Sequence, residues 1–171
     1  MHIHAEAAER HTLSILVDDE AGILARVAGM FTARGYNIDS LTVAHATEDL
    51  SISRITIVTS GSAAMMEQII AQVDRLVPVH RVVDLTAQGP HVERELALIK
   101  VAGVGENRIE ALRLADVYRA RVVDATTASF VFELTGSSEK VNSFIAMLQE
   151  VGLVEVARTG VVAISRGKEA A

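Results

Sequence analysis

The chain has 171 residues, which is enough for one domain or for two small ones. Half of the residues are hydrophobic and 22% are charged, a balance typical of a globular protein rather than a disordered one. Only 4% are aromatic and tryptophan is absent, so we expect a core built mainly from Val, Ile, Leu and Ala.

The charge balance and the missing cysteines exclude several classes of function. There are 16 basic and 22 acidic residues, a formal net charge of -6, which argues against nucleic-acid binding because that function usually needs a basic face. The absence of cysteine excludes disulfides, thiolate nucleophiles and thiolate metal ligands. No stretch resembles a signal peptide or approaches the roughly 20 apolar residues that span a bilayer. We therefore expect a cytoplasmic protein that does not enter a membrane.

The first half of the chain alternates strand and helix patterns after a flexible tail, which we expect over residues 1–11. Aliphatic and β-branched residues predict a strand over 11–17, and apolar residues spaced by three and four predict a helix over 21–34. Gly35 is a natural helix stop. By the same criteria, strands are predicted over 36–44, 50–60 and 80–86, and a second helix over 61–77. The order β-α-β-β-α-β predicts a ferredoxin-like unit with both helices on one face of the sheet.

The second half repeats this order. It predicts strands near 95–102, within 120–136 and over 153–167, with helices over 105–118 and 137–152. The fold class is therefore α+β, with two ferredoxin-like βαββαβ domains whose antiparallel sheets carry helices on one face. We place the first domain over 12–87, a linker over 88–94 and the second domain over 95–171. Each half is small and has open sheet edges, so we expect at least a homodimer through side-by-side sheet pairing.

The sequence contains no recognisable catalytic constellation. The motifs HExxH, GxSxG and the Walker loop are absent. The consecutive acids Asp18, Asp19 and Glu20 cannot face one another as a catalytic carboxylate pair, and they suit a helix start instead. The segment over 102–108 only superficially resembles a phosphate loop, and a turn capped by Glu106 or Asn107 explains it. The histidines lack ligand spacing and are expected at the surface or at an interface, and His2 and His4 are expected to be solvated tail residues: His2, His4, His11, His45, His80 and His91.

Gly22 lies where the first strand passes into the first helix, and its setting suggests a ligand site. Its backbone permits close approach, and the N–H groups of Gly22, Ile23 and Leu24 begin a helix whose N-terminus favours an anion. The three neighbouring acids would repel a phosphate-rich ligand. A zwitterionic amino acid avoids this conflict, because its ammonium group can meet an acidic or amide oxygen while Ile23, Leu24 and Ile38 surround an aliphatic side chain. A plain structural turn is the alternative.

Four segments together resemble one known family. They are DDEAGILARVAGMFTARGYNIDSLTVA, SRITIVTSG, HVERELALIKV and EVARTGVVAISRG. They are similar to the small, regulatory subunit of acetohydroxyacid synthase (acetolactate synthase), whose first domain is an ACT domain. The resemblance covers nearly the whole chain after the tail, and the combination of RGYNI-x-SLTV with HVERE and GVV-x-ISRG is its most specific part.

The resemblance implies a regulatory function without catalysis in this chain. It implies a large catalytic subunit as partner, and thiamine diphosphate, Mg and FAD would be bound by that subunit and not by this one. The small subunit would activate the large one and confer feedback inhibition by a branched-chain amino acid, usually valine. The effector would lie between two ACT domains of a homodimer. One chain would contribute the turn and helix start, and the other the start of the second strand: Asp19, Gly22, Ile23 and Leu24 from the first; Asn37 and Ile38, with Ala44 close by, from the second.

Asp19 departs from the asparagine that is common in the family. Aspartate keeps an acceptor for an ammonium group but loses the NH₂ donors and adds negative charge near the ligand carboxylate. Either valine binds less tightly or another amino acid is preferred, or else Asp19 only caps the helix. The alternative function is a free-standing ACT-domain amino-acid sensor of another pathway. An enzyme and a nucleic-acid regulator fit the residues poorly.

Overall fold

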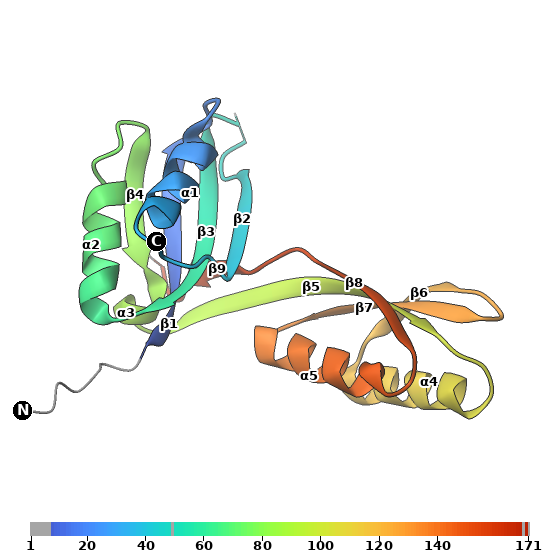
Figure 1. The fold of residues 1–171 in the computed structure, drawn as a ribbon. Helices are drawn as coiled ribbons and strands as arrows, with labels where there is room; N and C mark the ends of the chain where they lie inside the picture. Colours follow the sequence, from blue (N-terminus) through green and yellow to red (C-terminus); the bar gives the residue numbers. More distant parts are fainter. Residues whose placement is uncertain (1–7, 49, 169, 171) are drawn as a thin grey trace, which may run out of the picture. The chain divides into compact units, whose positions relative to one another are not determined.

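The computed structural model of the chain describes residues 8–48, 50–168 and 170, and these form two compact units (Figure 1). The first unit holds the residues up to Glu93 together with those from Val161 onward. The second unit holds Arg94–Gly160.

The first unit is a four-stranded antiparallel sheet in the order β2-β3-β1-β4, and helices α1 and α2 lie on one face of it (Figure 1). A short helix, α3, follows the last of these strands. The elements are β1 (Glu9–Asp18), α1 (Ile23–Ala33), β2 (Ser40–His45), β3 (Ile52–Gly61), α2 (Ala63–Val73), β4 (Val79–Asp84) and α3 (Leu85–Gln88).

The second unit repeats this topology, with the sheet order β6-β7-β5-β8 and helices α4 and α5 on one face (Figure 1). Its first strand begins within the first unit. The elements are β5 (His91–Ala102), α4 (Glu106–Tyr118), β6 (Arg121–Ala125), β7 (Ser129–Gly136), α5 (Ser138–Gln149) and β8 (Leu153–Arg158). The predicted fold class, two βαββαβ units with helices on one sheet face, is confirmed.

The two cores follow the predicted apolar patterns but differ in composition. In the first, α1 buries Ile23, Val27 and Phe31 against aliphatic side chains of β1 and β3. In the second, Phe132 and Phe144 are fully buried, with ring centroids 6.1 Å apart in an edge-on arrangement. Phenylalanine therefore has a larger part in the second core than the low aromatic content predicted.

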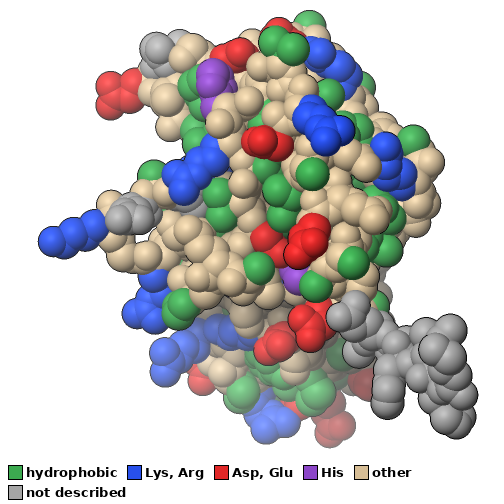
Figure 2. Space-filling view, turned by 90° about the vertical axis from the view of Figure 1, so that its left-hand side faces the viewer, with side chains coloured by type: hydrophobic (Ala, Val, Ile, Leu, Met, Phe, Trp, Pro, Cys, Tyr) green, Lys and Arg blue, Asp and Glu red, His purple; other side chains and the backbone are tan. Residues whose placement is uncertain are grey.

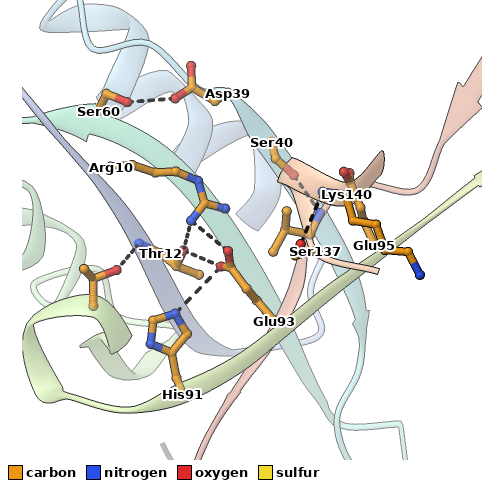
Figure 3. Close-up of polar contacts among 12 residues, drawn as sticks. Arg10, Thr12, Asp39, Ser40, Ser60, His91, Glu93, Glu95, Ser137 and Lys140 are labelled. Carbon is orange, nitrogen blue, oxygen red and sulfur yellow. Dashed lines mark hydrogen bonds and ion pairs between the residues drawn. The ribbon is translucent and has the colours of Figure 1, made fainter. Parts of the chain in front are cut away.

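The end of the predicted tail and the predicted linker are more ordered than expected. β1 begins at Glu9, so the last residues of the predicted tail pair with β3. Residues 1–7, which include His2 and His4, lie outside the described part of the chain. The predicted linker over 88–94 overlaps the start of β5. Glu93 of β5 accepts a hydrogen bond from Thr12 Oγ1 (3.0 Å) and pairs with Arg10 (2.8 Å), which fixes this segment to β1 (Figure 3).

The segment after Gly160 returns to the first unit, whereas the sequence placed it with the second domain. Strand β9 (Val162–Ser165) pairs with β5. The Val161 N–H donates to Ser40 Oγ (2.8 Å), Thr42 Oγ1 donates to the Val161 carbonyl (2.9 Å), and Arg81 donates to the Ala170 carbonyl (2.7 Å). These partners alternate with the core-facing Leu41 and Val82. The segment therefore runs over the face of the first sheet opposite the helices.

Candidate functional site

The N-terminus of α1 is open to an incoming ligand. Gly22 is the N-cap, with φ 87°, and no side chain caps the helix. There is no acidic side chain in the first turn, which begins at Ile23. A Cβ built at Gly22 would meet nothing within 4 Å. The Ile23 N–H donates to the Glu20 carbonyl (3.3 Å). The N–H groups of Leu24 and Ala25 and the positive end of the helix dipole are thus the part of the first turn that can meet a carboxylate.

Each of the three consecutive acids before this helix has a basic partner from a different element. Asp18 accepts from His80 Nε2 of β4 (2.6 Å), and Glu20 pairs with Arg26 of α1. Asp19 accepts from Ser53 Oγ of β3 (3.1 Å), and its Oδ2 lies 3.7 Å from Nδ1 of His45, the last residue of β2.

The interpretation of Asp19 as a helix cap is wrong. The cap position belongs to Gly22, and the Asp19 side chain faces β2 and β3 instead of the helix N–H groups. The same applies to the turn before α4, which was expected to be capped by Glu106 or Asn107. There the N-cap is Gly105, again without a side-chain hydrogen bond, and Glu106 is the first residue of the helix.

The sheet register separates the two groups of predicted site residues within one chain. Ser40, at the start of β2, is aligned through Val58 with Thr12, whereas Asp18 pairs with Ile52. Thr12 and Asp18 are six residues apart along one strand, about 20 Å at ~3.3 Å per residue. Asn37 and Ile38 precede Ser40 and so lie at the opposite end of the sheet from Asp19, Gly22, Ile23 and Leu24.

The remaining predicted site residues have distinct settings. The Asn37 side chain is exposed and donates to Asp39, while its carbonyl accepts from Thr59 Oγ1 (2.6 Å). Ile38 packs partly against the first core, and Leu24 is 39% exposed. Ala44 lies at the Asp19 end of the sheet, yet it pairs with Arg54 and points to the opposite face. On that face, burial and then the like charge of Arg81 lower the pKa of Arg54.

His45 and Ser53 were not among the predicted site residues. His45 was expected only at the surface or at an interface, and no local pattern connects Ser53 with a residue 34 positions earlier. His11 was also expected at the surface or at an interface, and within this chain it is buried, 6% exposed, with Nδ1 2.7 Å from Asp84 Oδ2. Among the residues that the structure describes, no group of three potential metal ligands comes together.

On the face shown in Figure 2, acidic and basic side chains are interspersed among apolar ones. Within the described ranges, no helix combines the length and the apolar character that a membrane span needs.

Two family descriptions match the chain, one for each half. Residues 13–81 match the "AHAS small subunit-like ACT domain", and residues 94–167 match the "Small subunit of acetolactate synthase". The chain belongs to the acetolactate synthase small-subunit family. It is 45% identical over 161 residues to the acetolactate synthase small subunit of Haemophilus influenzae, covering 94% of this chain and 98% of the relative. It is 46% identical over 159 residues to the isozyme 3 small subunit of Escherichia coli, covering 92% and 96%.

The likeness extends to three dimensions. The crystal structure of the acetolactate synthase small subunit from Thermotoga maritima superimposes with a TM-score of 0.83 at 36% identity, covering 94% of this chain and 99% of that one. The family therefore accounts for both units of the chain and not only for its first domain.

Proposed function

We propose that this chain is the non-catalytic regulatory subunit of an acetolactate synthase. In this proposal it activates the thiamine-diphosphate-dependent large subunit and confers feedback inhibition by valine in branched-chain amino-acid biosynthesis, in the cytoplasm. The relatives are named as small subunits of this enzyme, which supports the large subunit as the partner. The observation that carries the effector site is the uncapped N-terminus of α1 with the Asp19 carboxylate beside it.

This arrangement suits a zwitterion because it offers opposite charges to the two ends of the ligand. The N–H groups at Leu24 and Ala25 and the helix dipole favour the carboxylate. The Asp19 carboxylate favours the ammonium group. The open space over Gly22 leaves room for the ligand, and the partly exposed Leu24 offers an apolar contact for a branched aliphatic side chain.

The separation of the two residue groups supports a site shared by two chains. Asn37 and Ile38 lie about 20 Å along the sheet from the Asp19 turn of their own chain, so they cannot complete the same pocket. β2 is an edge strand of the first sheet. Two-fold pairing of two such edges would run the two copies of β2 antiparallel and set the start of one near the end of the other. We therefore propose a homodimer through the ACT domain, with the turn of one protomer facing Asn37 and Ile38 of its partner.

The test is a valine titration of acetolactate formation by the cognate large subunit, with and without this chain. We expect the chain to raise activity and valine to reverse the rise. Gly22→Asp should raise the valine concentration for half-inhibition at least about tenfold, because its carboxylate enters the ligand space and opposes the ligand carboxylate. Activation itself should persist, since Gly22 faces open space.

Gly89→Asp is the matched control, at the end of α3 and after β4, the sheet edge remote from β2. Gly89 also has a positive φ, 129°, with nothing within 4 Å of its Cβ, so the variant adds the same charge at another strained glycine. It should keep normal valine inhibition. Unchanged inhibition in Gly22→Asp, or an equal loss in Gly89→Asp, would contradict the proposed site. Failure of the chain to activate any large subunit would favour a free-standing amino-acid sensor.

A further inference from the structure

The two carboxylate oxygens of Asp19 have different surroundings. Oδ1 accepts a hydrogen bond from the hydroxyl of Ser53, which is buried (2% exposed) and so holds the carboxylate in one orientation. Oδ2 faces the imidazole of His45 across 3.7 Å, where both side chains are nearly half exposed. Oδ2 is therefore the oxygen that a ligand from solvent can reach, and His45 is the side chain that stands beside it.

We propose that His45 is an effector-site residue that controls access of the ligand's ammonium group to Asp19. This inference rests on the proposed function, because it assumes that an amino acid binds at the start of α1. A neutral imidazole leaves the charge of Oδ2 uncompensated and available to the ammonium group. An imidazolium ion pairs with Oδ2 and repels the ammonium group, so ligand and proton compete for the same carboxylate.

The other charges at this end of the sheet do not substitute for His45. Asp18 is paired with His80, and Glu20 with Arg26. Arg54 lies on the opposite sheet face, where it donates to Ser14 (2.6 Å). Glu48, in the turn after β2, is exposed and adds negative charge.

Two of the three basic partners of the acidic turn are thus histidines, the side chains that change charge near neutral pH. Lower pH favours the imidazolium form of a histidine side chain, which would compete with the effector at Oδ2. Effector affinity should therefore fall as the pH falls and rise as the pH rises. Because the pair is exposed, the whole change should be no more than about fivefold.

His80 provides a matched control. It makes the same kind of half-exposed pair, with Asp18 instead of Asp19, and it comes from β4 on the other side of β1. His80→Gln removes the same titrating charge from the same turn but leaves the surroundings of Asp19 Oδ2 unchanged. A general effect of net charge would alter both variants equally, whereas competition at Oδ2 would alter only His45→Gln.

The experiment is calorimetric titration of valine into the full-length chain between about pH 6 and pH 8, with circular dichroism to verify folding. We expect the wild type and His80→Gln to bind valine up to about fivefold more tightly at the upper pH, and His45→Gln to bind with little pH dependence. Added valine should also move the imidazole NMR signals of His45 toward those of the neutral form. A pH-independent wild type, or a His45→Gln variant that keeps the wild-type slope, would overturn the role of His45. Absence of valine binding in every variant at every pH would overturn the proposed function itself.

Discussion

The two units place a pair of one acidic and one basic side chain at the same position of their sheets, with the acidic member on the last strand in the first unit and on the first strand in the second. Each first strand has an irregularity, after Leu16 in β1 and after Lys100 in β5. Counted back from there, His11 with Asp84 in the first unit corresponds to Glu95 with Arg158 in the second. The repeated topology thus retains a charged or polar link between the first and last strands while its chemistry differs. The units differ more clearly at other corresponding positions.

The starts of the two matching helices are such a difference. α1 and α4 both begin after a glycine with positive φ and without a side-chain cap. The first turn of α4 contains Glu106, whereas the first turn of α1 contains no acid. The carboxylate of Glu106 satisfies the positive end of its own helix dipole. Only the first unit therefore presents an uncompensated helix start beside an independent carboxylate, which is why the effector proposal concerns that unit.

Replacing one buried phenylalanine in each core by alanine is the strongest way to compare the two units. Phe31→Ala in the first unit and Phe132→Ala in the second should each lower the free energy of unfolding by about 3–5 kcal/mol, because both side chains are fully buried. Urea denaturation followed by circular dichroism measures the loss. Valine binding should weaken in Phe31→Ala, since Phe31 packs α1 onto its sheet, and persist where Phe132→Ala is folded. Equal loss of binding in both would contradict an effector site confined to the first units.

Breaking these two pairs, each of which has a buried acid, should have a smaller effect. Asp84→Ala removes the partner of His11 and the oxygen that accepts from the N–H groups of Thr86 and Ala87 at the start of α3. Arg158→Ala leaves the Glu95 carboxylate, 4% exposed, without its ion-pair partner. Each should cost about 2–4 kcal/mol in the same denaturation measurement. A loss below about 1 kcal/mol for both would show that these pairs behave as surface ion pairs.

The second helix of each unit offers a milder comparison. Ser62 and Ser137 are N-caps of α2 and α5, and their hydroxyls accept from the N–H groups of Met65 and Lys140 at the same distance, 3.3 Å. Ser→Ala at either site should cost about 1 kcal/mol, and Ser→Gly less. Thermal unfolding of the two variants should give nearly equal shifts. Clearly unequal shifts would show that one helix end is stabilised by other contacts.

Gly105→Asp should have the smallest effect on regulation. It repeats in the second unit the change that Gly22→Asp makes in the first, at a glycine with φ 61° and open space around its Cβ. Because Glu106 already occupies this helix start, we expect no ligand there and no change in the valine concentration for half-inhibition. The readout is the same valine titration of acetolactate formation. A weakened feedback would indicate that the second unit also takes part in effector binding.

The order of elements was predictable because it depends on local patterns, whereas the partners of polar residues were not. The apolar spacing of Ile23, Val27 and Phe31 indicated α1 and its buried face. Nothing local indicated that His11 is buried, since its partner Asp84 is 73 residues away. The capping predictions were wrong for a different reason. A positive-φ glycine occupies the cap position in both turns, which leaves the neighbouring acids free for other partners.

The placement of the last strand depended on contacts that span more than a hundred residues. Val161 contacts Ser40 and Thr42, 121 and 119 positions earlier, and the GVVAISRG pattern alone predicts a strand without identifying its partner. The two-chain effector site stays a prediction. The sheet register supports it by separating Asn37 from Asp19 within one chain.

The return of the chain to the first unit after Gly160 affects how the protein folds while it is being translated. A ribosome makes the residues of the second unit before it makes β9. One face of the first sheet therefore stays uncovered while about 70 further residues are translated, which takes several seconds at ~5–20 residues per second. The second unit, being continuous, can finish folding earlier. The part of the molecule that is synthesised first is therefore the last to be completed, and newly made chains are open to chaperones or to aggregation at that face during the interval.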